Sequence, residues 1–206
     1  MPSVYDLKPA FQGLLRPLTR ALAAAGVTAN QVTVAAAALS LATGGALAAW
    51  AERPRVWLLV PAVLFVRMAL NAIDGMLARE HGQKSRLGGL LNEIGDVVSD
   101  AALLLPFARV PGVSAPLVVV IVALAGVTEA AGLAAVAIGA SRRYDGPMGK
   151  SDRALVFGAL GLLLALGVGA GRWTDVALAA IIVMLAWTVA NRVRRALAEP
   201  AGRDRA

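Results

Sequence analysis

Residues 71–100 read NAIDGMLAREHGQKSRLGGLLNEIGDVVSD, and they join the end of one long apolar block to the start of the next. Within these blocks lie four side chains whose oxygen atoms suit metal or proton chemistry: Asn71, Asp74, Asn92 and Asp96. Offsets of three and four residues place Asn71 with Asp74, and Asn92 with Asp96, on one face of a helix. Because ionisable groups inside apolar helices are costly, this stretch is a candidate functional site.

The chain as a whole is strongly apolar. Of its 206 residues, 58% are hydrophobic and 16% are charged, and the mean hydropathy is +0.69. Soluble proteins have about a quarter of their residues charged, whereas about 20 apolar residues span a bilayer as a helix. The long blocks therefore favour an all-α integral membrane protein over a soluble Ala-rich bundle. The absence of cysteine excludes disulfides and thiolate metal sites, and the single histidine, His81, argues against a histidine-based site.

We predict one membrane domain, a six-helix transmembrane bundle over residues 32–191 with a cytoplasmic tail over 192–206. Before the bundle, residues 7–25 mix leucines with Arg16 and Arg20. This mixture is typical of an amphipathic helix in the membrane interface, with a disordered leader as the alternative. The six predicted spans are Val32–Ala51, Val56–Ala78, Leu87–Phe107, Val113–Ala140, Ala154–Gly171 and Val176–Asn191.

Lysine and arginine residues are distributed unevenly between the two sides of the predicted membrane. The N-terminal segment, the loops after spans two and four and the C-terminal tail hold fifteen of them; the other loops hold four, and Arg67 lies within a span. The positive-inside rule then places both termini in the cytoplasm. This distribution explains the net charge of +7 without nucleic acid as a partner.

The four polar residues of the opening stretch are predicted to lie near the cytoplasmic side. At about 1.5 Å per residue, Asp74 and Asn92 lie roughly 6–8 Å from the helix ends, and Asn71 and Asp96 about 12 Å. Two antiparallel helices would present them at two matched levels. Such an all-oxygen site suits Mg²⁺, Mn²⁺ or Ca²⁺. Isolated, solvent-facing carboxylates are the alternative.

A second charged group is predicted deeper, about 18 Å from the same side. It contains Arg67, Asp100 and Glu129. Since an arginine at that depth must be paired, we expect Arg67 to join the two acids in a structural network linking spans two, three and four.

Residues 71–100 resemble the signature of the CDP-alcohol phosphotransferases, D-x-x-D-G-x-x-A-R, about eight residues, then G-x-x-x-D-x-x-x-D. Asp74-Gly75, Ala78-Arg79, Gly88 and Asp96 match it in identity and spacing, whereas Asn71 and Asn92 replace its first and third acids. Residues 26–33, GVTANQVT, are similar to the family's G-(I/V)-T-P-N-x-x-T segment, with Ala29 in place of proline.

The resemblance implies a metal-dependent transfer of a phosphatidyl-type group from CDP-diacylglycerol to an alcohol, with release of CMP, in phospholipid biosynthesis. It implies a homodimer in a bacterial-type inner membrane, with the site facing the cytoplasm and one or two Mg²⁺ or Mn²⁺ ions. Asp96 would be the general base. The metal ligands would be Asn71, Asp74, Asn92 and Asp96, and the nucleotide contacts Gly75, Ala78, Arg79, Ser85 and Gly88.

Basic residues in the loop after the fourth predicted span and at the end of the sixth are candidates for binding the acceptor alcohol. In relatives that use phosphorylated acceptors, such residues bind the acceptor's phosphate, and Lys150, Arg153 and Arg192 match that placement. Glycerol 3-phosphate is the acceptor we expect first. The positive-inside rule alone is the alternative explanation of these cations.

Other functions are compatible with part of the pattern. Because two asparagines replace acids of the signature, one alternative is a catalytically altered or inactive member of the family. A membrane prenyltransferase also binds a diphosphate through aspartate-rich helices and Mg²⁺, but normally has more spans. A small transporter would have polar residues at the membrane midplane, often in paired halves, whereas no internal duplication is visible here.

Overall fold

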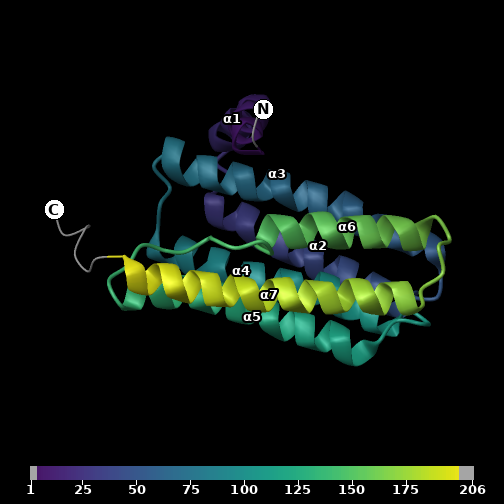
Figure 1. The fold of residues 1–206 in the computed structure, drawn as a ribbon. Coiled ribbons are helices and arrows are strands. Elements are labelled where there is room, and N and C mark those ends of the chain that lie inside the picture. Colours follow the sequence, from purple (N-terminus) through teal and green to yellow (C-terminus); the bar gives the residue numbers. More distant parts are fainter. Residues whose placement is uncertain (1–3, 200–206) are drawn as a thin grey trace. The chain divides into compact units, whose positions relative to one another are not determined.

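The computed structural model describes residues 4–199, and no strand occurs among them. The chain runs through seven α-helices and two short 3₁₀ helices in that range (Figure 1). Their bounds are α1 Val4–Ala24, α2 Ala29–Ala49, η1 Pro54–Leu58, α3 Leu59–Glu80, α4 Arg86–Leu104, η2 Leu105–Arg109, α5 Ala115–Ala137, α6 Lys150–Ala165 and α7 Arg172–Ala198.

Contacts divide the chain into two compact units. The first contains the described residues up to Ala42 together with Ala62–Ser99. The second contains Thr43–Pro61 and the described residues from Asp100 onward. The prediction of one membrane domain stays a prediction.

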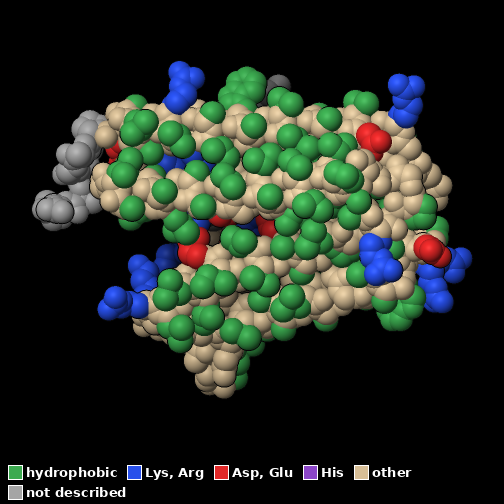
Figure 2. All heavy atoms as spheres, turned by 90° about the horizontal axis from the view of Figure 1, so that it is seen from below, with side chains coloured by type: hydrophobic (Ala, Val, Ile, Leu, Met, Phe, Trp, Pro, Cys, Tyr) green, Lys and Arg blue, Asp and Glu red, His purple; other side chains and the backbone are tan. Residues whose placement is uncertain are grey.

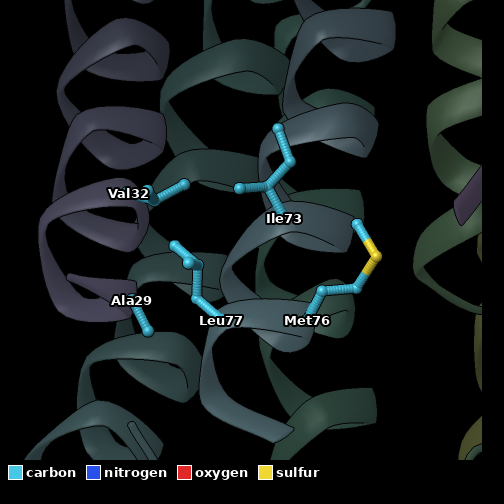
Figure 3. Close-up of a cluster of buried hydrophobic side chains, with 5 residues drawn as sticks. All are labelled: Ala29, Val32, Ile73, Met76 and Leu77. Carbon is cyan, nitrogen blue, oxygen red and sulfur yellow. The ribbon is translucent and has the colours of Figure 1, made fainter. Parts of the chain in front are cut away.

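The core of the first unit lies where α2 meets α3. Ala29 and Val32 of α2 pack with Ile73, Met76 and Leu77 of α3, and each is at most 6% exposed (Figure 3). Partly buried side chains from α1, from the turn before α2 and from α3 pack against this cluster, namely Leu15, Leu22, Ala23, Val27, Leu70 and Ala78. This packing fixes the register of α2 against α3.

Helix α1 has the amphipathic character expected for residues 7–25. Leu14 and Leu18, one turn apart, are 77% and 50% exposed, whereas Leu15 and Leu22 pack on the core. Arg16 donates two hydrogen bonds to the Glu80 carboxylate, at 3.1 and 2.9 Å, which joins α1 to the end of α3. Its location at a membrane interface stays a prediction.

In the second unit, α5 and α7 pack side by side (Figure 1). Small residues allow other close approaches: a Cβ on Gly44 would collide with the backbone of Ala102. Aromatic rings fill the space between η1, η2 and α6. Phe107 lies 4.5 Å from Trp57 and 5.2 Å from Phe157, measured between ring centroids.

Four helical segments are long and apolar enough to cross a membrane, namely Ala29–Ala49, Pro54–Glu80, Ala115–Ala137 and Arg172–Ala198. Hydrophobic side chains spread over much of the face drawn in Figure 2. The other two predicted spans correspond to α4, which carries one basic and three acidic residues, and to α6, which has 16 residues. The helical fold with candidate membrane spans is therefore confirmed, and the count of six spans stays a prediction.

Two of the helix boundaries that differ from the prediction concern the candidate acceptor residues. Helix α6 begins at Lys150, four residues before the expected start, because Asp152 accepts a hydrogen bond from the Gly149 amide and caps the first turn. Helix α7 continues to Ala198. Residues 192–198 of the predicted tail are thus helical, and residues 200–206 lie outside the described residues.

Candidate functional site

The first turn of α4 is built around Ser85. Its hydroxyl accepts a hydrogen bond from the Gly88 amide at 2.9 Å, so Ser85 caps the helix. A Cβ on Gly88 would lie 2.6 Å from Asn30 Oδ1 and 3.0 Å from Ser85 Oγ. Only glycine therefore lets the start of α2 approach α4 this closely. The Gln83 side chain joins the same segments, because its Oε1 accepts from the Ala29 amide at 2.7 Å.

Asp74 is buried on α3 and bound to α2. Its Oδ2 accepts a hydrogen bond of 2.8 Å from Thr33 Oγ1, and the two residues are 7% and 9% exposed. Thr33 also lies beside α4, since a Cβ on Gly95 would be 4.0 Å from Thr33 Cγ2. The threonine therefore fixes one carboxylate oxygen of Asp74 at the point where three helices meet.

The polar face of α3 is turned towards α4. Arg67 Nη2 lies 3.6 Å from Asp96 Oδ1, and the arginine side chain is 5% exposed. Arg67, Asn71 and Asp74 are spaced by four and three residues, so they share one side of α3. Asn71, Asn92 and Asp96 are all partly exposed. The ion pair thus links Asp96 of α4 to the side of α3 that carries Asn71 and Asp74.

The remaining predicted nucleotide contacts lie at the end of α3. The Arg79 guanidinium folds back over Gly75, where a Cβ would lie 3.0 Å from both of its terminal nitrogens. Ala78 packs against the cluster of Figure 3. The absence of a side chain at Gly75 therefore lets the Arg79 guanidinium, a binding group for anions, lie against the helix.

The donor set of this site decides which metal would fit. Within residues 4–199, no three His, Cys, Asp or Glu side chains gather as a metal-binding group. Two carboxylates, Asp74 and Asp96, and two carboxamides, Asn71 and Asn92, are the candidate ligands. An all-oxygen set with two negative charges suits one hard divalent cation whose shell is completed by substrate phosphate. It suits a second cation less well.

The predicted acceptor residues belong to the second unit, and two of the three are buried. Arg153 and Arg192 are each 2% exposed, whereas Lys150 is partly exposed at the start of α6. Arg153 donates to Asp100 Oδ2 at 2.8 and 3.0 Å and to Glu129 Oε1 at 3.0 Å. Arg192 Nη1 lies 3.6 Å from Glu129 Oε2.

The loop between α5 and α6 encloses this cluster. The Asp145 carbonyl accepts from Arg192 Nε at 3.3 Å, and its carboxylate binds Arg143 at 2.8 Å and Arg195 at 2.7 Å. Burial raises the pKa of Asp145, but the hydrogen bond and charge of Arg143 and the charge of Arg195 outweigh it and hold the pKa below its ordinary value.

Several of these contacts were not predicted. The sequence assigned Arg67 to Asp100 and Glu129. In the structure Arg67 lies beside Asp96, and Arg153 pairs with both acids. Thr33 and Asn30 lie in the quoted segment 26–33, but no role was given to them. The signal for Glu129 was its position in an otherwise apolar span, where it needed cationic partners.

Comparison with known proteins supports the predicted family. The family described as CDP-alcohol phosphatidyltransferase matches residues 26–191. The chain is 49% identical over 195 residues to "Inner membrane protein YnbA" of Escherichia coli (strain K12), covering 95% of this chain and 96% of that protein. It is 33% identical over 98 residues to the archaetidylinositol phosphate synthase of Pyrococcus horikoshii, covering 48% of this chain and 50% of that protein.

Two solved structures of the Mycobacterium tuberculosis phosphatidylinositol phosphate synthase share the fold. One has CDP-DAG bound and the other is in complex with manganese and citrate. Each has a TM-score of 0.73 and 23% sequence identity to this chain, covering 92% of it and 96% and 92% of the respective synthase chains.

Proposed function

Because the chain belongs to the CDP-alcohol phosphatidyltransferase family, we propose that it transfers a phosphatidyl-type group from a CDP-linked lipid to an alcohol and releases CMP, as part of phospholipid biosynthesis. The observation that carries this proposal is the pair of facing polar helices, with Asp74 held by Thr33 and Asp96 by Arg67. The synthase structure with CDP-DAG bound supports a CDP-lipid donor.

In the proposed step, the acceptor's hydroxyl oxygen bonds to the β-phosphorus of the CDP group. The bond between that phosphorus and the bridging oxygen breaks, and its electron pair leaves with CMP. The hydroxyl proton moves to Asp96, which acts as the general base. Arg67, 3.6 Å from Asp96 Oδ1, orients the carboxylate.

The metal ligands in this proposal are Asp74, Asp96, Asn71 and Asn92, which would hold one Mg²⁺ or Mn²⁺ ion. When bound, the ion supplies neutralisation of charge on the diphosphate and the departing CMP. The synthase structure in complex with manganese supports such a site. Since two asparagines replace acids of the family signature, we propose that any second ion binds weakly.

The nucleotide subsite in this proposal consists of residues at the end of α3 and the start of α4. Gly75 leaves room for the Arg79 guanidinium to lie over the helix, and that guanidinium can bind a phosphate oxygen. The proposed contacts are Gly75, Ala78, Arg79, Ser85 and Gly88.

The membrane topology is likewise a proposal. Four helices suited to membrane spans, and a 49% identical relative named as an inner membrane protein of Escherichia coli, support a bacterial inner membrane. The uneven distribution of lysine and arginine supports six spans, cytoplasmic termini and a site facing the cytoplasm. We also propose that the protein is a homodimer and that α1 lies in the membrane–water interface.

The acceptor subsite in this proposal contains Lys150, Arg153 and Arg192. Glycerol 3-phosphate, the acceptor expected first from the sequence, has to be compared with unphosphorylated alcohols, because Arg153 and Arg192 are paired with Asp100 and Glu129 and would bind its phosphate only where those ion pairs open. The names of the two synthase relatives, which make inositol phosphate lipids, keep phosphorylated alcohols among the acceptors to be tested.

The test is CMP release by the purified chain in detergent with CDP-diacylglycerol, Mg²⁺ and a panel of alcohols. Asp96→Asn should lower the rate at least about 100-fold, the usual contribution of a general base. Asp175→Asn is the matched control, because Asp175 accepts a hydrogen bond from the Ser114 amide and has no proposed role. No CMP release with any alcohol, together with no CMP-dependent reversal, would contradict the proposal and favour an inactive member or a transporter.

A further inference from the structure

We propose that the acceptor of this chain is an unphosphorylated alcohol and that Glu129 sets this preference. The inference rests on the proposed function, because it takes Arg153 and Arg192 as part of the acceptor subsite. Its basis is that Arg153 and Arg192 already form ion pairs with carboxylates of the chain itself.

Glu129 is shared by three arginines. The residue is 8% exposed, and its carboxylate oxygens lie 3.0 Å from Arg153 Nη2, 3.6 Å from Arg192 Nη1 and 3.7 Å from Arg142 Nη2. An acidic side chain buried among three guanidiniums reduces the positive potential that would otherwise attract an anionic ligand.

The hydrogen-bond donors of Arg153 are directed at the protein. Nε and Nη2 donate to Asp100, and Nη2 donates also to Glu129. Nη1 donates to Thr128 Oγ1 at 3.1 Å and to the Met148 carbonyl at 3.3 Å. A phosphate would therefore have to replace these contacts rather than bind to donors that face an open site.

Two nitrogens of Arg192 are also bound to the protein. Its Nη1 donates to the Thr128 carbonyl and its Nε to the Asp145 carbonyl. The packing around it is close, because a Cβ on Gly132 would lie 3.2 Å from Arg192 Nη1 and 2.6 Å from the Arg143 carbonyl oxygen. On the side of Gly132, the space beside Arg192 is therefore already filled.

The charges lead to the same conclusion. Three guanidiniums, those of Arg142, Arg153 and Arg192, face two carboxylates, those of Asp100 and Glu129, so the acids cancel two of the three positive charges. A phosphate dianion placed here would lie beside both acids, and like charges at short range repel strongly where water is excluded. A neutral alcohol changes no charge, and its hydroxyl can donate to a carboxylate oxygen.

The experiment compares matched acceptors with the purified full chain, CDP-diacylglycerol and Mg²⁺, measuring CMP release. The pairs are glycerol with glycerol 3-phosphate, and inositol with inositol 1-phosphate. We expect the unphosphorylated member to react faster by about tenfold or more at equal concentration. Faster transfer to the phosphorylated members would overturn the inference and leave the proposed function standing, whereas no CMP release from any acceptor would overturn both.

A variant tests the role of Glu129 itself. Glu129→Gln removes one negative charge beside the arginines and should shift the ratio of rates about tenfold towards the phosphorylated acceptors, while Glu129→Asp should keep the original ratio. Glu199→Gln is the matched control, because Glu199 pairs with Arg143 at 2.7 Å and contacts neither Arg153 nor Arg192. An unchanged ratio in folded Glu129→Gln refutes the assigned role; if that variant does not fold, the comparison of acceptors in the unmodified chain still decides the acceptor class.

Discussion

Replacing Thr33 by valine removes one hydroxyl and leaves a side chain of nearly the same shape. The lost group is the donor that binds Asp74 Oδ2 at 2.8 Å, between residues that are 9% and 7% exposed. A hydrogen bond to a charged group contributes about 1.5–3 kcal/mol. At about 1.4 kcal/mol per factor of ten, a loss of this size expressed wholly in the transition state lowers the transfer rate about 10- to 150-fold.

Two measurements separate positioning from stability in this variant. The first is the rate of CMP release with CDP-diacylglycerol and the best alcohol, and the second is the thermal unfolding midpoint in detergent. Thr33→Ser keeps the donor and should stay within a few-fold of the unmodified rate. In an Asp74→Asn background, Thr33→Val should lower the rate of CMP release by a smaller factor, because the two side chains act as one unit.

The reasoning fails if Thr33→Val is as active and as stable as Thr33→Ser. It also fails in part if Thr33→Val unfolds at a lower temperature but keeps its full rate, because Thr33 would then stabilise the helix contact without positioning Asp74 for the reaction.

Three further predictions follow from the packing and charge of named residues. Gly44→Ala should destabilise the protein by about 1–3 kcal/mol by forcing a methyl group against the α4 backbone, whereas Gly45→Ala, with open space at its Cβ, should not; thermal unfolding in detergent compares them. Asn71→Asp combined with Asn92→Asp should strengthen binding of a second Mn²⁺ in a metal titration, and two tightly bound ions in the unmodified chain would contradict the weak second site. Hydrogen bonds from the hydroxyl and amide of Ser141 hold the pKa of Glu199 below its ordinary value of 4.5. The stabilisation that Glu199 gives to the loop after α5 is therefore complete above about pH 4.5 and is lost as the pH falls through the lowered pKa. Cleavage of that loop by an acid protease should increase over this pH range, and should increase less in Glu199→Gln, which has already lost the charge.

The family and the polar faces of α3 and α4 could be predicted because they depend on spacing along the chain. Asp74 and Asp96 stand in a long signature, and helical periodicity places each beside its asparagine. Their partners could not be predicted in the same way. Thr33 is 41 residues from Asp74, and a depth count gives the level of Arg67 in the membrane but not the direction in which its side chain points.

The acceptor region shows a second limit. The sequence placed Arg153 in a cytoplasmic loop, where a cation needs no partner, but Asp152 and Gly149 start α6 earlier and turn Arg153 inward as a buried helical residue. Positive charge near a helix end was therefore a weak guide to which cations are available to a ligand.

The position of Glu129 at the centre of three arginines has a consequence for how related sequences diverge. A substitution at this one site alters three ion pairs at once, so tolerated changes should occur together with changes at Arg142, Arg153 or Arg192. Homologues that keep the three arginines but have lost the acid are then expected to be those that accept anionic alcohols. Position 129 becomes a marker by which members of one family can be sorted by substrate before any of them is assayed.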